Sequence, residues 1–243
     1  MILFRRSELK VRYNMEHNGT AIGLGHFRDL NTHVRYHELP NDISLAWIGL
    51  EPGEHFSALA HPVDSFLIVQ KGKALFQGAQ SSEMSNGDLV QIPQNYWHEY
   101  AMGDDEGFEA LSLTFEGQPL FSPERPPFLE QSSIPKKAEN FVFVRRSEKC
   151  FRDYDRLLPS GYRARWIYVK EGKTEKIEFQ GPTYIINFDG RCKIAGEHQD
   201  IEMLSQDIMY FDIADTLQFS TLRKSTLLSL ERINPEVELE GLS

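Results

Sequence analysis

Short apolar runs that end at turn residues recur along the first half of the chain. Residues 65–70 (Ser-Phe-Leu-Ile-Val-Gln) stop before Gly72, and residues 89–92 (Leu-Val-Gln-Ile) follow Gly87 and stop at Pro93. Glycine adopts the positive φ that a tight hairpin turn needs, and proline ends a strand because it has no N–H to donate. Strands of this length and spacing predict an antiparallel β-sandwich or barrel.

Two further segments alternate with the period of a strand. In residues 54–61 the alternation brings Leu59 and His61 to one face, since successive side chains of a strand point to opposite sides. The second segment, 96–102, presents on one face Tyr96, His98, Tyr100 and Met102. Together with Trp47, these side chains predict an aromatic and apolar cavity that binds a small molecule. The alternative is a packed barrel core, because small barrels can fill with side chains.

The spacing of these stretches resembles the two motifs of the cupin superfamily. The first stretch runs from Gly53 to Gly72 and the second from Gly87 to His98. In cupins the first motif carries His-x-His and a glutamate, and the second carries one histidine. These four side chains together hold a divalent metal inside a β-barrel. The resemblance implies an all-β, jelly-roll (double-stranded β-helix) fold.

Carried over position by position, the resemblance leaves two of the four metal ligands in place. His61 matches the second histidine of the first motif, and His98 matches the histidine of the second motif. Leu59 stands at the position of the first histidine and Ser65 at that of the glutamate, where both should line the cavity. The resemblance thus implies that His61 and His98 are the catalytic and metal-binding candidates. The implied cofactor is a divalent metal, Zn, Mn, Fe or Ni.

Other residues of the first half are candidates for a third ligand. Asp64 would supply a carboxylate if its turn slipped by one residue. His33 and His37 would approach from an earlier strand, whereas His55 lies about 20 Å from His61 along an extended strand. Without a third ligand, two neutral imidazoles bind divalent ions weakly and with poor selectivity.

Short segments recur in the same order in the two halves of the chain. Residues 4–8 (Phe-Arg-Arg-Ser-Glu) recur as 144–148 (Val-Arg-Arg-Ser-Glu), and later matches keep an offset of about 118, which predicts a tandem duplication. Five prolines between residues 117 and 140 indicate an extended linker. The whole chain therefore resembles a bicupin. Its expected parts are an N-terminal barrel over 1–116, a Pro-rich linker over 117–140 and a C-terminal barrel over 141–243.

The second copy lacks metal ligands at most of the matched positions. Those positions hold Gln180 opposite His61, Thr183 or Tyr184 opposite Ser65, Asp212 opposite Pro93, and Leu217 or Gln218 opposite His98. Only Asp212 offers a group that binds transition metals. We therefore expect no metal in the C-terminal barrel, which would be structural or would line a metal-free pocket.

Composition and charge narrow the classes of partner. The 243 residues include 36 acidic and 26 basic side chains and carry a net charge of −10, which disfavours a nucleic-acid-binding surface. No apolar run approaches the ~20 residues that cross a bilayer, so no membrane partner is expected. Residues 1–8 carry charges where a secretion signal would be apolar, which favours the cytoplasm. Cys150 and Cys192 give neither a disulfide framework nor a Cys-x-x-Cys metal pattern.

Two classes of function fit these features. The first is an enzyme of small-metabolite metabolism, either a metal-assisted isomerase, lyase or oxygenase, as the resemblance implies, or a metal-free acid–base catalyst. The second is a non-catalytic ligand-binding or structural bicupin whose metal site has decayed. In the enzyme and the ligand-binding protein alike, the partner is a small molecule held in the N-terminal barrel. Open apolar sheet faces also favour a homodimer.

Overall fold

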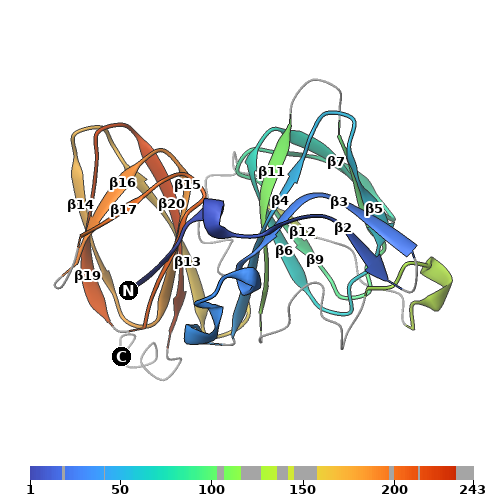
Figure 1. Ribbon diagram of the computed structural model, residues 1–243, viewed down its shortest axis with the longest axis horizontal. Helices are drawn as coiled ribbons and strands as arrows, with labels where there is room; N and C mark the ends of the chain where they lie inside the picture. The colour runs from blue at the N-terminus through green and yellow to red at the C-terminus, as the bar shows by residue number, and fades with distance from the viewer. Residues whose placement is uncertain are drawn as a thin grey trace. The chain divides into compact units, whose positions relative to one another are not determined.

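A computed structural model describes residues 1–17, 20–40, 42–102, 107–115, 127–135, 142–144, 158–196, 200–212 and 214–233. Within these ranges the chain consists of β-strands and short 3-10 turns, without an α-helix and without any helix that could span a membrane (Figure 1). The strands of the first half are β1 (Ile2–Phe4), β2 (Val11–His17), β3 (Thr20–Asp29), β4 (Ile43–Leu50), β5 (His55–Leu59), β6 (Ser65–Lys71), β7 (Lys73–Gln77), β8 (Ser81–Ser85), β9 (Leu89–Ile92), β10 (His98–Met102) and β11 (Phe108–Phe115). The later strands are β12 (Val142–Val144), β13 (Tyr162–Val169), β14 (Thr174–Phe179), β15 (Thr183–Asp189), β16 (Cys192–Ala195), β17 (Asp200–Met203), β18 (Ile208–Phe211), β19 (Asp215–Thr221) and β20 (Ser225–Arg232). The 3-10 turns are η1 (Arg6–Glu8), η2 (Leu30–Thr32), η3 (Tyr36–Glu38) and η4 (Gln131–Ser133).

The strands form two barrels, each built from two antiparallel sheets. In the N-terminal barrel a seven-stranded sheet, β12-β9-β6-β11-β4-β3-β2, packs on a four-stranded sheet, β5-β10-β7-β8. Leu67 of the first sheet and Phe76 of the second belong to one buried core. In the C-terminal barrel the sheets are β1-β18-β15-β20-β13 and β14-β19-β16-β17, and Ile185 and Ile194 share their core. The predicted all-β fold with two tandem jelly-roll barrels is confirmed.

The first strand of the chain joins the C-terminal barrel. β1 pairs antiparallel with β18, so that Phe4 lies opposite Ile208 and is fully buried. Arg5, which follows β1, forms an ion pair with the buried carboxylate of Asp207. In Figure 1 the chain accordingly begins, at the label N, among the orange and red strands of the second half.

A strand from the second half of the chain likewise joins the N-terminal barrel. β12 follows the linker in sequence, yet Phe143 of β12 pairs with Val90 of β9 in the N-terminal barrel. Two compact units result, Leu9–Lys149, and Met1–Glu8 together with Cys150–Ser243. The opening strand of each sequence repeat therefore completes a sheet built mainly from the other copy, whereas the sequence placed residues 1–8 in the first barrel. Periodicity does not reveal which sheet edge a strand joins, because every strand offers the same backbone donors and acceptors.

Two glycines form the hairpin ends that the sequence predicted. Gly72 has a φ of +74° and Gly87 a φ of +88°, values that disfavour other residues. A Cβ on Gly72 would also lie 2.0 Å from the carbonyl oxygen of Gly107. These turns let β6 and β9 run side by side, with Ser65 opposite Ile92.

Part of the Pro-rich linker returns to the N-terminal barrel. Phe128 and Ala60 exchange two backbone hydrogen bonds of 2.8 and 3.0 Å, and Leu129 packs against the barrel core. The linker residues 117–126 and 136–140 lie outside the described part of the chain. The described piece lies next to His61, which follows Ala60 directly.

Candidate functional site

The two histidines singled out by the sequence lie close together in the N-terminal barrel. His98 opens β10 and pairs with Leu59 of the neighbouring strand β5, and His61 follows two residues after Leu59. The side chains of both histidines are buried, at 2% and 1% exposure. Their ring centroids are 6.0 Å apart, and the ring planes are inclined by 50°. The structure therefore brings the two imidazoles together at one end of the barrel.

Backbone contacts hold the loop between β9 and β10 against the loop that carries His61. The N–H of Asn95, which has a φ of +65°, donates to the carbonyl oxygen of His61 at 2.6 Å. The N–H of Gln94 donates to the carboxylate of Asp64 at 2.7 Å. Asp64 is exposed and is used to hold this loop, so it does not supply the third metal ligand that a slipped turn would have allowed.

Burial and one hydrogen bond set the protonation state of His98. Its Nδ1 lies 2.8 Å from the carbonyl oxygen of Tyr96, and because a carbonyl only accepts, Nδ1 carries the proton. The lone pair of the neutral ring is then on Nε2. Burial lowers the pKa of His98 to about 4, against the opposing effect of the Tyr96 carbonyl. His98 is therefore a neutral hydrogen-bond acceptor at neutral pH.

Aromatic rings surround His98. Phe76 stacks on it with ring centroids 5.4 Å apart and planes inclined by 21°, and Tyr100 meets it edge-on at 5.3 Å. Tyr96 lies 6.4 Å away, and its hydroxyl accepts a hydrogen bond from the N–H of Ala79 at 3.0 Å. Burial raises the pKa of Tyr100, so its phenol stays protonated. Tyr96 and Tyr100 belong to the buried core, and Met102 packs against that core while remaining half-buried.

Leu59 and Ser65, which stand at the positions of the missing ligands, both occupy the interior. Leu59 is fully buried in the barrel core. Ser65 is buried and shares its face of β6 with Leu67, which is a core residue. Trp47 does not line the interior, contrary to the sequence prediction. It alternates with Ala46 and other core residues of β4, so its side chain lies on the opposite face of that strand and does not line the interior.

Three further hydroxyls reach the interior, and the sequence reasoning missed them. Thr114 lies opposite Ser44, and Ser112 lies opposite Ala46 and Leu67, two residues of the barrel core. Ser44, Ser112 and Thr114 are all buried. The signal was present in the alternation of small or polar residues with leucines along 110–114 (Ala-Leu-Ser-Leu-Thr). That alternation gives β11 one face of small or polar side chains and one face of leucines.

The donor set does not fit the metal that a cupin fold implies. Among the described residues, no three side chains of His, Cys, Asp or Glu come together in a way that would hold a metal ion. Leu59 has no lone pair, and the hydroxyl of Ser65 is neutral and cannot offset a divalent charge. His33 and His37 lie in the η2–η3 turns rather than on a strand, where their Nδ1 atoms contact backbone groups.

The C-terminal barrel carries apolar residues at the positions that match the two histidines. The pairing of Phe219 with Ile194 repeats that of Tyr100 with Phe76, which puts Leu217 at the position of His98. The same registers put Thr183 at the position of Ser65, as expected, and Phe179 at that of His61. The sequence alignment had placed Gln180 opposite His61, one residue too far along. Gln180 and Asp212 are exposed and do not face the core.

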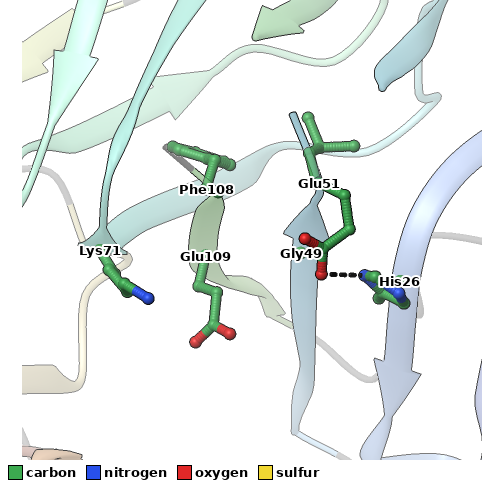
Figure 2. Close-up of a pocket in the computed structure, with 8 residues that line it drawn as sticks. His26, Gly49, Glu51, Lys71, Phe108 and Glu109 are labelled. Carbon is green, nitrogen blue, oxygen red and sulfur yellow. Dashed lines mark ion pairs between the residues drawn. The ribbon is translucent and has the colours of Figure 1, made fainter. Parts of the chain in front are cut away.

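A separate pocket of about 130 Å³ lies on the N-terminal barrel away from the two histidines. Register places His26, Gly49, Glu109 and Lys71 side by side across strands β3, β4, β11 and β6. Figure 2 shows Glu51 and Glu109 in this pocket, with the ion pair of 3.9 Å between His26 and Glu51. Lys71 and Ser65 are at opposite ends of β6, about 20 Å apart by strand geometry. The sequence reasoning did not single out this pocket.

Comparisons with known proteins agree with this geometry. Residues 46–114 match the family model described as Cupin domain. The chain has the cupin fold. No curated protein matches it.

Solved structures of Bacillus subtilis oxalate decarboxylase resemble the whole of the chain. A variant of that enzyme with tyrosine in place of a tryptophan superposes with a TM-score of 0.70 at 12% identity, over 100% of this chain and 83% of the other. The enzyme at pH 4.6 gives a TM-score of 0.69 at 12% identity, over 100% and 82%. A study of its Mn(II) centres provides a further match, with a TM-score of 0.68 at 12% identity, over 100% and 83%. At this identity the likeness extends to the bicupin fold.

Proposed function

We propose that the protein is a small-molecule-binding bicupin whose ligand lies in the N-terminal barrel beside His61 and His98. The observation that carries the proposal is the pair of buried imidazoles, 6.0 Å apart, at one end of a barrel with aromatic walls. Buried polar groups are costly unless they are used, and here they converge with hydroxyls on one region. A few convergent polar groups in an apolar enclosure are the usual make-up of a ligand site.

Within this proposal, different residues of the barrel make different contacts with the ligand. The Tyr96 carbonyl holds the His98 ring in one orientation and one tautomer, so that Nε2 offers a fixed lone pair. Phe76 and Tyr100 supply faces and edges against which an apolar part of a ligand packs. Ser65 supplies a buried hydroxyl that donates or accepts. Each of these contacts favours a ligand that carries both a hydrogen-bonding group and an apolar surface.

The proposal includes two versions, an enzyme of isomerase, lyase or oxygenase type and a non-catalytic binding protein. A general base works best when its pKa is near the operating pH. The pKa of His98 is lowered to about 4, which makes it a weak base but leaves it a good hydrogen-bond acceptor. This observation favours the non-catalytic version. The oxalate decarboxylase neighbours favour the enzyme, by analogy of fold alone.

The metal implied by the fold is not part of the proposal. A bound Zn, Mn, Fe or Ni ion would act as a Lewis acid or would activate water. His61 and His98 are the residues that would hold it, and the described residues add no carboxylate or third imidazole. The proposed function therefore involves no metal-dependent step.

The test combines metal analysis with histidine variants. Protein purified without chelator is analysed for bound metal, and a library of small metabolites is screened by the shift in melting temperature. For any hit, His61→Ala and His98→Ala should weaken binding by at least about tenfold, the value of one lost hydrogen bond. His55→Ala, at an exposed histidine of β5, is the matched control. Equal losses of binding and of folding stability would identify the two histidines as ordinary core residues and would refute the proposal.

A further inference from the structure

The pocket on the seven-stranded sheet of the N-terminal barrel gathers charged side chains around a glycine. The neighbouring strands β3, β4, β11 and β6 each contribute one residue to it, respectively His26, Gly49, Glu109 and Lys71. Glu51 follows Gly49 by two residues and therefore lies on the same side of its strand. Figure 2 shows the four charged or ionisable side chains one after another beside Gly49. The pocket volume of about 130 Å³ is close to the ~150 Å³ of a cavity that holds benzene, so it suits a molecule of about six non-hydrogen atoms.

Gly49 leaves the floor of this pocket open, although the fold does not require glycine there. Gly49 lies inside β4, and its φ is outside the left-handed region. A Cβ on Gly49 would lie 3.6 Å from the Cβ and Nδ1 of His26, which is an ordinary van der Waals distance. Glycine weakens the interior of a strand, and it often marks a place where a ligand approaches the backbone closely. The absence of a side chain at Gly49 is therefore typical of a binding site.

The C-terminal barrel has an aromatic ring at the position of this glycine. The strand registers put Tyr168, opposite Thr226, where the N-terminal barrel has Gly49 opposite Glu109. Tyr168 is half-buried, and its ring stacks with that of Trp166 at a centroid distance of 6.5 Å. The same strand of the same kind of barrel therefore accommodates a large side chain at this point. The open floor and the carboxylate of Glu109 are properties of the N-terminal copy.

The charges around the pocket favour a ligand with a protonated amine. Glu109 on the strand next to Gly49, and Glu51 farther along β4, supply two carboxylates, whereas Lys71 supplies one ammonium. An anion above Gly49 would be repelled by both carboxylates. An amine there would donate charge-assisted hydrogen bonds to them, which are stronger than those between neutral groups. A metal ion needs at least three close ligands, which the described His, Cys, Asp and Glu residues do not assemble, but an ammonium needs only acceptors for its N–H groups.

We propose that this pocket is a second binding site, for a small molecule that carries a protonated amine above Gly49 and a hydroxyl within reach of Lys71. The amine donates to the carboxylates of Glu51 and Glu109, and the ammonium of Lys71 donates to the hydroxyl oxygen. Lys71 and Ser65 are the two ends of β6, so the site is separate from the region of the two histidines. The proposal therefore does not depend on the proposed function.

Ethanolamine, ethylene glycol and glycolate test the charge of the ligand. The three molecules share a hydroxymethyl group, and their other group is respectively cationic, neutral and anionic at pH 7. Each is titrated into the isotope-labelled full chain, and binding is measured from the NMR shifts of the backbone amides around Gly49. Probes of this size bind with affinities on the order of millimolar. Ethanolamine should bind at least about tenfold more tightly than ethylene glycol or glycolate.

Three variants test the residues. Glu51→Gln and Glu109→Gln keep the shape of the side chain and remove its charge, and each should weaken ethanolamine binding by about tenfold or more. Gly49→Tyr copies Tyr168 of the C-terminal barrel, fills the pocket and should abolish binding. The matched control is Glu83→Gln on β8, where the side chain is 63% exposed, against 66% for Glu51. Glu83→Gln should leave ethanolamine binding unchanged.

Several results would overturn the proposal. They are the absence of shifts around Gly49 with ethanolamine, equal binding of the three probes, and ethanolamine binding that neither Glu51→Gln nor Glu109→Gln weakens. An equal loss from Glu83→Gln would also overturn it, because the effect would then reflect the net charge of the chain. If Gly49→Tyr does not fold, the two glutamine variants decide the outcome against the Glu83→Gln control.

Discussion

The two barrels share the order of their common strands, apart from the additional β3 and β2 of the N-terminal barrel, and differ at the positions of the two histidines. In the N-terminal barrel, His61 and His98 lie among aromatic rings and hydroxyls. In the C-terminal barrel the matching positions hold Phe179 and Leu217, both fully or almost fully buried in a core of aliphatic, aromatic and sulfur-containing side chains. Phe179 packs edge-on against Phe211, with ring centroids 5.4 Å apart. The imidazoles of one barrel are thus replaced by apolar side chains in the other, which still buries the hydroxyls of Thr183 and Ser229.

This difference teaches that the barrel fold does not depend on its ligand chemistry. The features common to both copies are alternating apolar positions, positive-φ glycines at the turns, and matching strand registers. The buried imidazoles of one copy add desolvation cost without being needed for the architecture. Under the proposed function, contacts with a ligand offset this cost in the N-terminal barrel.

The largest expected effect on folding stability concerns β1, the strand from the start of the chain that belongs to the C-terminal barrel. Phe4→Ala removes a fully buried ring from the C-terminal barrel and should lower the free energy of unfolding by about 3–5 kcal/mol. Urea denaturation measures the loss, and hydrogen exchange should locate it in β18, the pairing partner of β1. Leu222→Ala, at a side chain that is 89% exposed, should stay within about 0.5 kcal/mol. Loss of protection in β9 rather than β18 would contradict the strand exchange.

The second prediction uses pH to compare a buried imidazole with the leucine of the other barrel. The folded-state pKa of His98 is about 4 and lies below the ordinary 6.5, so the unfolded chain binds the proton more tightly. The stability contributed by the neutral ring is therefore complete above pH 6.5 and is lost as the pH falls to 4. The loss amounts to about 3 kcal/mol, at 1.36 kcal/mol per pH unit.

His98→Leu lacks this titration, so its stability relative to the unaltered chain should rise by about 3 kcal/mol between pH 7 and 4. Denaturation of both proteins at each pH gives the difference between their free energies of unfolding. The contributions of all titrating groups other than His98 are common to both proteins and cancel in this difference. Asp29 makes this cancellation necessary. Burial raises its pKa to about 6, so the folded state binds the proton more tightly than the unfolded chain and gains stability as the pH falls. A difference that does not change with pH would mean that His98 is not buried in its neutral form.

The third prediction restores the missing ligands. Leu59→His with Ser65→Glu should complete a site of three histidines and a carboxylate, and should raise the affinity for zinc or manganese by about two orders of magnitude. Calorimetric titration measures the affinity. The matched control makes the same changes in the C-terminal barrel, Ile177→His with Thr183→Glu, where His61 and His98 have no counterparts. Equal metal binding by both variants, or a stoichiometric metal already held by the unaltered chain through further ligands, would contradict the assignment.

The smallest expected effect is that of His98→Leu on folding at pH 7. The change loses one hydrogen bond to the Tyr96 carbonyl and gains apolar burial, so the free energy of unfolding should change by about 1 kcal/mol or less. The reverse change, Leu217→His, buries a new polar ring without a partner and should cost about 1–3 kcal/mol more. Thermal and urea unfolding of the two variants measure both values. A larger loss from His98→Leu would make the histidine a structural element of the barrel.

Local sequence features predicted the fold well because local physics sets them. The turn glycines Gly72 and Gly87, the alternation through His98, and the repeat itself depend on backbone conformation and on period-two side-chain placement. These rules act over a few residues and can be recognised in any sequence. They placed His61, His98, Leu59 and Ser65 at the same end of one barrel, as the structure has them.

Tertiary structure alone decided the remainder. Which sheet β1 joins depends on a partner strand about 200 residues away, and no local pattern encodes that choice. Trp47 and Ala46 are neighbours on a fully buried strand, so hydrophobicity could not tell which one faces the interior. The low pKa of His98 arises from burial by several strands together, and its tautomer from the Tyr96 carbonyl. The sequence by itself therefore determined the two barrels and the positions of the two histidines in the first, whereas burial in the assembled interior determined the charge and the tautomer of His98.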